Sequence, residues 1–322
     1  MSPQGQFLVA DIGATNARFA WAGEAGLSRD VLHLRTSVST DSGALLDLAL
    51  SRLDGPRPAA AALAIAGPVE EGRGRMTNGV LRFDAAELSS RLGCPVTVIN
   101  DFHAMARALP HLEHLRQIGG GVPKPGVKAV LGPGSGLGMG VLVPRGGGWQ
   151  VLASEGGHGD LAPGSPLETE LLSVLQQEHG HVSWETVLSG PGLVRLYGAV
   201  CRVWGVDPKE ISQEQISSLG LNADEPVCHQ TLEVFFSVLG GAAGNLALTV
   251  CAQGGVYLGG GILPGLAAFA AASPLRRRFD ERGPLSNMVR EIPLYLILDE
   301  EPGLTGALAC LRDRLNDHTT PV

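Results

Sequence analysis

Two glycine-rich turns, each set between two short apolar segments, restrict the possible folds of this 322-residue chain. The first turn covers residues 11–16, and the second covers residues 132–138 and contains four glycines. In both places the apolar run before the turn and the apolar or alternating run after it predict two strands that return antiparallel. The arrangement occurs twice, about 120 residues apart, and predicts two α/β lobes that each open with such a hairpin.

The rest of the chain alternates between strand and helix patterns. Apolar runs predict buried strands at residues 59–66, 95–99 and 255–258. Helical spacing predicts helices at residues 41–53, 85–92, 167–178, 193–204, 232–250 and 306–315. This alternation is typical of an α/β fold, in which ligands collect at the carboxyl ends of strands. We therefore expect the two lobes to leave a ligand-binding cleft between them.

Composition argues against several classes of protein. The formal net charge of −8 does not favour a binder of nucleic acid or of anionic membranes, because such surfaces need clustered positive charge. The 5 cysteines are far apart and form no Cys-x-x-Cys pair, which indicates reduced thiols rather than disulfides or structural zinc. Residues 1–6 lack the pattern of a signal peptide, and no apolar run approaches the roughly 18 residues of a membrane span. We therefore expect a cytoplasmic protein.

The first turn has the residue types that a phosphate-binding turn needs. Gly13 allows a tight bend and a close approach of the backbone to a ligand. Thr15 and Asn16 offer a hydroxyl and an amide to phosphate oxygens. Asp11 could hold Mg²⁺ through water, because Mg²⁺ keeps much of its hydration shell. The alternative is an ordinary hairpin with a capping aspartate.

The second turn resembles a backbone nest for anions. Its glycines allow consecutive free N–H groups to face one ligand, and Ser135 could donate one more hydrogen bond. No Gly-Lys-Ser/Thr follows, so it is not a Walker loop. Two such turns together suggest a triphosphate held from both lobes. The glycines of residues 259–261 and 303–306 could let adenine approach the backbone, or they could be structural turns.

Asn100 and Asp101 directly follow the predicted strand at residues 95–99. A carboxylate at the end of a buried strand can face the cleft and accept a proton from a substrate hydroxyl. The alternative is a helix N-cap in front of residues 102–106. Because the two glycine turns accompany this pair, we favour the catalytic base.

Glu155 and His158 follow the predicted strand at residues 149–153, with two glycines between them. A carboxylate accepts hydroxyl protons and an imidazole both accepts and donates, so the pair matches the vicinal hydroxyls of a sugar. Zinc is the competing ligand, but no second His or Cys stands at helical ligand spacing. Glu185 is a third candidate carboxylate, although such a residue is more often a solvated part of a helix.

These features together resemble the bacterial glucokinase family, within the fold shared by sugar kinases, actin and heat-shock-chaperone ATPases. The matching segments run in order over nearly the whole chain, at residues 11–18, 99–102, 132–138, 155–158, 188–193, 255–261 and 302–306. The resemblance implies a two-lobed actin-like ATPase (ribonuclease H-like) α/β fold with an inter-lobe cleft. The expected lobes are a small one at residues 1–110 plus 303–322 and a large one at residues 111–302.

The same resemblance implies roles for individual residues. Asp101 would be the catalytic base, and the sugar hydroxyls would be bound by Asn100, Asp101, Glu155, His158 and Glu185. ATP would be held by Ala10, Asp11, Ile12, Gly13, Ala14, Thr15, Asn16, Gly134, Ser135, Gly136 and Gly260. Mg²⁺ would be held mainly through phosphates and water. The family and the low surface charge also suggest a homodimer.

The sequence departs from the family pattern at two positions. Ala14 replaces the usual second glycine of the first turn, and Leu81 replaces an aromatic residue expected three positions after residues 75–78. No cysteine lies between Cys94 and Cys201, so the Cys-rich zinc motif of the related ROK kinases is missing. We therefore expect a zinc-free branch of the family.

The expected activity is the ATP-dependent phosphorylation of glucose at its 6-hydroxyl, giving glucose 6-phosphate and ADP. A broader hexose or amino-sugar kinase, acting on mannose or glucosamine, is the nearest alternative. A sugar-sensing regulator with a kinase-like fold is another, although a regulator normally needs a DNA-binding segment and the first predicted strand already starts at Phe7. An actin-like or chaperone-type ATPase is a third, but it needs no set of hydroxyl-binding side chains.

Overall fold

The computed structural model describes residues 6–222 and 225–317, and it divides the chain into two compact units. Unit 1 comprises residues 1–113 and 299–322, and unit 2 comprises residues 114–298. Residues 1–5, which carry most of the segment judged to lack a signal peptide, lie outside the described residues. Each unit is a mixed α/β structure with its own main sheet.

Unit 1 is built on a five-stranded sheet of order β3-β2-β1-β4-β8. Its strands are β1 (Phe7–Ile12), β2 (Asn16–Gly23), β3 (Gly26–Arg35), β4 (Ala60–Ile65) and β8 (Val96–Asn100). The pairs β1–β2 and β2–β3 are antiparallel, which confirms the predicted hairpin, whereas β1, β4 and β8 are mutually parallel. The carboxyl ends of these three strands therefore meet at one edge of the sheet.

Alternate residues of β1 face two separate hydrophobic clusters. Leu8, Ala10 and Ile12 pack with apolar residues of α1 (Ser42–Arg52) and α2 (Ala85–Leu92). Phe7 and Val9 pack with α3 (Asp101–Ala108) and α12 (Pro302–Asp317). The sheet is thus covered on both faces, which is why its central strands are almost continuously apolar.

Smaller elements complete unit 1. They are η1 (Thr36–Val38), η2 (Leu109–His111) and a three-stranded sheet of β5 (Val69–Glu70), β6 (Arg73–Arg75) and β7 (Arg82–Asp84). Leu81, just before β7, is 1% exposed and belongs to the hydrophobic core. The position expected to hold an aromatic residue for stacking on sugar is therefore occupied by a core side chain.

Unit 2 is built on a six-stranded sheet of order β12-β11-β10-β13-β14-β9. Its strands are β9 (Leu115–Gln117), β10 (Lys128–Pro133), β11 (Leu137–Arg145), β12 (Gly148–Ser154), β13 (Val256–Leu258) and β14 (Leu294–Ile297). β10 and β11 form the second predicted hairpin, and β10, β13 and β14 are parallel. As in unit 1, the turn follows a strand that has a parallel neighbour.

The helices of unit 2 surround one large hydrophobic cluster. They are α4 (Pro166–His179), α5 (Trp184–Val187), α6 (Gly190–Trp204), α7 (Gln213–Gly220), α8 (Pro226–Val250), α9 (Ala267–Ala272), α10 (Leu275–Asp280) and α11 (Ser286–Glu291). Short 3₁₀ turns are η3 (Gly156–His158), η4 (Pro264–Leu266) and η5 (Gly283–Leu285).

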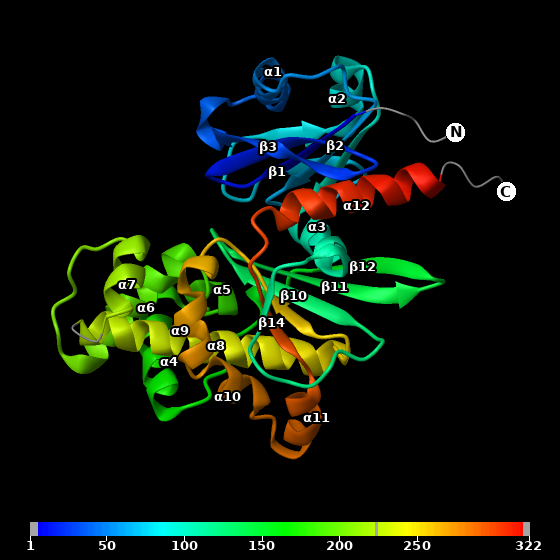
Figure 1. Cartoon of the computed structure of the whole chain (residues 1–322). Coiled ribbons are helices and arrows are strands. Elements are labelled where there is room, and N and C mark those ends of the chain that lie inside the picture. The colour runs from blue at the N-terminus through cyan, green and yellow to red at the C-terminus, as the bar shows by residue number, and fades with distance from the viewer. Residues whose placement is uncertain (1–5, 223–224, 318–322) are drawn as a thin grey trace. The chain divides into compact units, whose positions relative to one another are not determined.

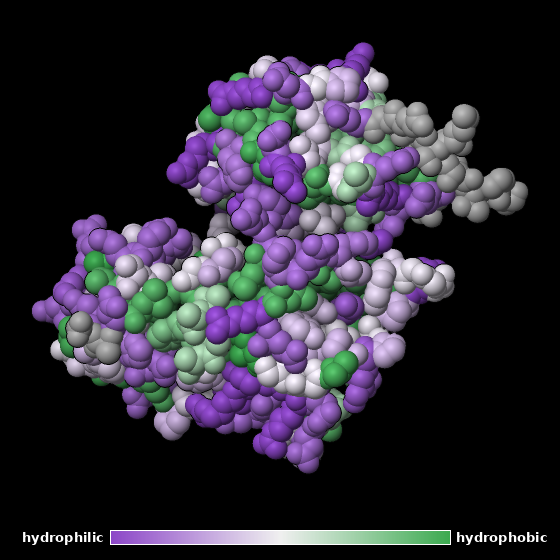
Figure 2. All heavy atoms as spheres, in the orientation of Figure 1, coloured by the Kyte–Doolittle hydropathy of each residue, from purple (hydrophilic) through white to green (hydrophobic). Residues whose placement is uncertain are grey.

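Helix α8 is long and apolar enough to cross a membrane by length and composition alone. No such helix is predicted from the sequence. Of its 18-residue apolar window, 67% is buried inside the protein, as is typical of a core helix. Figure 2 shows hydrophobic and hydrophilic residues interspersed on the displayed face. Single exposed residues such as Val80 and Val122 are ordinary on protein surfaces.

Two predicted segments need correction. The helix expected at residues 232–250 begins at Pro226, a favoured residue for the first helical position. Of the two alternatives for residues 303–306, the structural turn is wrong, because these residues form the first turn of α12. Gly303 packs against the side chain of Asp11, and Gly306 packs against the backbone of Ala104. Both glycines serve close packing, and both are buried.

Close packing of α12 on α3 generates a prediction about stability (Figure 1). A Cβ added at Gly306 would overlap the carbonyl oxygen of Ala104, and backbone cannot move aside cheaply. We expect Gly306→Ala to lower the free energy of unfolding by about 1–3 kcal/mol, measured by chemical denaturation.

Gly198→Ala in α6 is the matched control, because a Cβ there meets nothing within 4 Å. It should leave stability unchanged or raise it by up to about 1 kcal/mol through helix propensity. Equal losses in the two variants would contradict the packing argument.

Candidate functional site

The turn between β1 and β2 is fixed by its own backbone and by one threonine. The N–H of Gly13 donates to the carbonyl of Asn16 at 2.9 Å. The Thr36 hydroxyl donates to the carbonyl of Gly13 at 2.7 Å, and its N–H donates to that of Thr15 at 3.0 Å. Within the described residues, the N–H groups of Ala14 and Thr15 have no acceptor. Two successive free donors of this kind suit an anionic oxygen.

The side chains of this segment point in different directions. Thr15 and Asn16 are exposed, whereas Ala10 and Ile12 are fully buried in the core. The carbonyl of Ile12 also accepts a hydrogen bond from the N–H of Ala66. Of the residues expected to hold ATP here, Thr15 and Asn16 can therefore present side chains to a ligand. The side chains of Ala10 and Ile12 instead pack in the core beneath the strand that leads into the turn.

Asp11 lies in a cluster of charged side chains, of which the sequence predicts a role only for Asp11 itself. Arg18, its partner across the β1–β2 pair, donates to the Asp11 carboxylate at 3.1 Å. The Nε of Arg18 also lies 3.3 Å from Oε2 of Glu301, just before α12. His33 on β3 lies 3.6 Å from the other oxygen of Glu301. Arg18 is thus shared by two carboxylates that come from opposite ends of the chain.

Burial changes the titration of both acids. It raises the pKa of Asp11 above its ordinary value, against the opposing effect of Arg18. It also raises the pKa of Glu301 to about 7, where Arg18 opposes burial and the negative charges of Asp11 and Glu300 add to it. Glu301 is only 16% exposed, so its charged form is poorly solvated.

The raised pKa of Glu301 predicts a pH dependence of stability. The ordinary pKa of the group is 4.5, so the folded protein binds this proton more tightly than the unfolded chain does. The resulting stabilisation is complete below pH 4.5 and is lost as the pH rises through about 7. Glu301→Gln stays neutral throughout. Relative to wild type, its free energy of unfolding should therefore rise by roughly 2–3 kcal/mol between about pH 4.5 and 8.5.

Denaturant titrations at the two pH values provide the measurement. Glu300→Gln is the control, since Glu300 is an exposed neighbour of the same charge and should show a much smaller change. A difference between Glu301→Gln and wild type that does not vary with pH would disprove the assignment.

Asn100 and Asp101 lie at the carboxyl end of β8, separated from β1 by β4 alone. Asn100 is the N-cap of α3, and its side-chain oxygen accepts from the N–H of His103 at 3.0 Å. Its amide nitrogen donates to the carbonyl of Gly67 at 3.1 Å and to Oδ1 of Asp101 at 3.0 Å. The alternative of a helix cap therefore holds for Asn100, which at the same time orients the carboxylate of Asp101.

The turn between β10 and β11 is held from two sides. The carbonyl of Gly134 accepts from the N–H of Gly190 at the start of α6, at 2.8 Å. The N–H of Leu137 donates to Oε2 of Glu185 at 2.8 Å. Within the described residues, the N–H groups of Ser135 and Gly136 have no acceptor. This turn thus offers a pair of free donors, as the first turn does.

Gly260, after β13, packs directly on the second turn. Its φ of +94° lies in the left-handed region, and a Cβ there would overlap the carbonyl oxygen of Pro133. Both the backbone conformation and the close approach require glycine.

Glu155 is the N-cap of η3 at the end of β12, His158 is the last residue of η3, and both are exposed. Gly157, between them, lies against the carbonyl of Leu137, so η3 packs on the second turn. Nδ1 of His158 lies 4.0 Å from Oε1 of Glu185. The structure thus brings Glu185, His158 and the glycine turn together. In the described part of the chain, no three His, Cys, Asp or Glu side chains form a group that could hold a metal ion.

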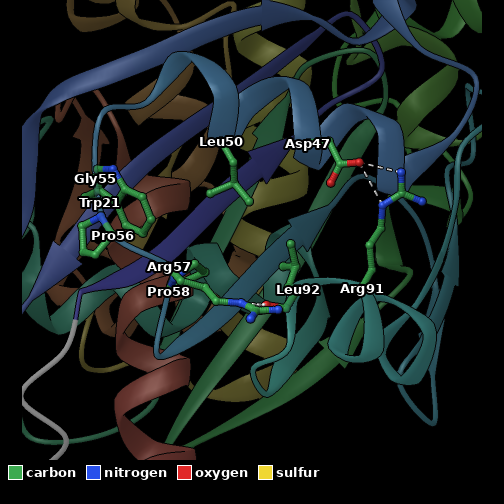
Figure 3. A pocket seen from close by; sticks show the side chains of 9 residues that line it. All are labelled: Trp21, Asp47, Leu50, Gly55, Pro56, Arg57, Pro58, Arg91 and Leu92. Carbon is green, nitrogen blue, oxygen red and sulfur yellow. Dashed lines mark hydrogen bonds and ion pairs between the residues drawn. The ribbon is translucent and has the colours of Figure 1, made fainter.

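A separate pocket of about 230 Å³ lies in unit 1 among Trp21, Asp47, Leu50, Gly55, Pro56, Arg57, Pro58, Arg91 and Leu92. None of the predicted site residues lines it. Figure 3 shows that its two arginines are already engaged. Arg91 contacts the carboxylate of Asp47 at 2.6 Å, and Arg57 donates to the carbonyl of Leu92 at 2.7 Å. Asp47 therefore balances the charge of Arg91, whereas Arg57, which bonds a neutral carbonyl, keeps its positive charge beside the pocket.

Comparisons with known proteins identify what this chain is similar to. The family model described as Glucokinase matches residues 8–314. A glucokinase of Chromobacterium violaceum is 42% identical over 319 residues, which cover 98% of this chain and 91% of that protein.

Solved structures of glucokinases are also similar to this chain. The crystal structure of glucokinase from an Antarctic psychrotroph has a TM-score of 0.84 and 37% identity, covering 96% of this chain and 99% of the other. That of glucokinase from Balamuthia mandrillaris in complex with glucose has a TM-score of 0.79 and 23% identity, covering 95% and 93%. The second shows likeness of fold alone.

Proposed function

The chain belongs to the glucokinase family and phosphorylates glucose with ATP, and we propose that the γ-phosphoryl group is transferred to the 6-hydroxyl. The observation that carries this assignment is the match to glucokinases over nearly the whole chain. Two turns with free N–H pairs and a carboxylate at the end of a parallel strand support it. We further assign the two units to the two-lobed actin-like ATPase (ribonuclease H-like) class, in which the substrates bind in the inter-lobe cleft.

In this proposal each unit contributes to both substrates. The triphosphate binds to the free N–H groups of residues 14–15 and 135–136, with Gly260 allowing the nucleotide to approach the backbone. The sugar hydroxyls bind to Asn100, Asp101, Glu155, His158 and Glu185. The support is chemical: successive backbone donors suit phosphate oxygens, and carboxylates with an imidazole suit hydroxyls.

Asp101 acts as the general base. Its carboxylate accepts the proton of the 6-hydroxyl as the sugar oxygen attacks the γ-phosphorus, and the bond to the ADP oxygen breaks. Charge in such a transition state lies mainly on the phosphoryl oxygens, so positioning and electrostatics dominate. A hydroxyl needs its base only late in such a reaction, and an ordinary aspartate is sufficient.

Mg²⁺ is the expected companion of ATP, and the residues present fit it. Asp11 offers one carboxylate, partly occupied by Arg18, which suits an ion that keeps most of its water ligands. Asp11 would hold this ion through water. When bound, the ion would neutralise charge on the phosphates.

The remaining expectations stay proposals. The product is glucose 6-phosphate, the first intermediate of glycolysis, and the enzyme works in the cytoplasm as a homodimer. A panel of glucose, mannose and glucosamine with ATP, ADP or polyphosphate tests the specificity. Turnover confined to ATP with glucose supports the narrow assignment, and equal turnover of several hexoses supports the broader kinase. ATP turnover that no sugar stimulates would contradict both.

Asp101→Asn tests the base. The variant keeps an oxygen that can accept from the N–H of Phe102 but removes the proton acceptor. We expect turnover to fall at least ~10²-fold in an assay coupled to oxidation of glucose 6-phosphate, with a smaller loss of glucose affinity.

Asp84→Asn is the control for Asp101→Asn. Asp84 is the last residue of β7 and accepts backbone N–H groups at the start of the following helix, α2. Its substitution should leave turnover close to wild type. Near-normal turnover of Asp101→Asn would remove the catalytic role.

Glu155→Gln and His158→Ala test the sugar-binding assignment. Hydrogen bonds that involve charged groups contribute about 1.5–3 kcal/mol, so each variant should bind glucose roughly tenfold more weakly or worse. Isothermal titration calorimetry measures the affinity. His181→Ala, an exposed histidine paired with Asp160 in the same unit, should leave it unchanged. Unaltered glucose affinity in both test variants would refute the placement.

A further inference from the structure

Glu185 makes contacts that a sugar-binding residue alone would not need. Its Oε2 accepts the N–H of Leu137 at 2.8 Å, at the point where the second glycine turn becomes β11. Its Oε1 lies on the side of His158, 4.0 Å from Nδ1. The side chain is 32% exposed, so one end remains open to a ligand. The two oxygens of one carboxylate thus face two different parts of the proposed site.

The second glycine turn packs closely against the carboxylate of Glu185. A Cβ at Gly136 would overlap Oε2 of Glu185 and cannot be added without moving one of them. The two N–H groups without acceptors, those of Ser135 and Gly136, lie between the Leu137 contact to Glu185 and the Gly134 contact to Gly190. The direction of these free donors therefore depends on both anchors.

The segment that carries Glu185 is itself rigidly held. Ser183 and Thr186 form a reciprocal capping box at the start of α5. The Ser189 hydroxyl donates to the carbonyl of Glu185 at 2.9 Å and accepts the N–H of Gly192 at 3.0 Å. Both anchors of the glycine turn, Glu185 and Gly190, belong to this one braced segment.

We propose that Glu185 is a positioning residue for the phosphoryl donor, holding the turn at residues 134–137 in the form that binds phosphates. This inference rests on the proposed function, in which the turn binds the nucleotide and Glu185 also contacts the sugar. Without the acceptor, the Leu137 N–H loses its partner and the turn gains freedom that nucleotide binding must then remove. A residue that bound sugar alone would have no effect on nucleotide affinity in the absence of sugar.

The test measures ADP affinity of the full chain by calorimetry with no sugar present. Glu185→Ala removes the acceptor and should weaken ADP binding about fivefold or more, the order expected for the net contribution of one hydrogen bond. Glu185→Gln retains an oxygen that can accept from Leu137, and it should restore ADP affinity to within about twofold of wild type. Glu185→Met keeps the length of the side chain without a strong acceptor and replaces Glu185→Ala if that variant does not fold.

Glu155→Ala is the matched control. It removes another proposed sugar carboxylate, whose side chain makes no hydrogen bond to the glycine turn within the described residues, unlike that of Glu185. It should weaken glucose binding and leave ADP affinity unchanged. Unchanged ADP affinity in Glu185→Ala or Glu185→Met, or an equal loss in Glu185→Gln, would overturn the inference.

These results are distinguishable from failure of the proposed function. If Glu185→Ala binds ADP like wild type while wild type phosphorylates glucose, only the positioning role is wrong. If wild type does not turn over glucose, the comparison of ADP affinities still reports on the turn.

Discussion

Both hairpin turns of this protein leave two successive backbone N–H groups without a protein acceptor in the described structure, so these donors are available to a ligand. The turns can do so because other contacts hold them open. Thr36 fixes the first through the carbonyl of Gly13, and Glu185 with Gly190 fixes the second. Each turn follows a strand that has a parallel neighbour, so its donors lie at the sheet edge where α/β proteins bind ligands. The proposed chemistry depends on this constraint.

The charges around the first turn show what such a site requires. A phosphate-binding turn is favoured by positive charge, yet Asp11 and Glu301 place two acids there with Arg18 between them. Burial keeps the pKa of Glu301 near neutrality, so the cluster need not carry two full negative charges. Gly303 lets the first turn of α12 approach the Asp11 side chain, and a helix N-terminus favours a negative group. The C-terminal segment that begins with Glu301 and α12 thus forms part of the environment of Asp11.

Local signals made much of this arrangement predictable. Glycines between apolar runs identify both turns, and polar pairs after strands identify Asn100 with Asp101 and Glu155 with His158. Contacts between segments that are distant in the sequence leave no such local signal. The sequence therefore predicts no role for Glu301. It also predicts none for Arg18, although Arg18 lies within the first of the segments that resemble the family. The structural-turn alternative at residues 303–306 is wrong because glycine also occurs where helices pack closely. The start of α8 at Pro226 is missed because polar residues such as His229 interrupt the apolar pattern there.

The two turns differ in how they are held, and this difference has a functional consequence. Thr36 is 5% exposed and neutral, and its hydrogen bonds to the first turn go to backbone carbonyls. Glu185 is charged and partly exposed, so a hydroxyl that donates to its open oxygen also changes the electrostatic field at the second turn. If sugar and nucleotide bind as proposed, Glu185 gives the second turn a direct route for responding to the sugar. Linkage requires any such response to be mutual, so a nucleotide that orders this turn must affect sugar affinity by the same factor.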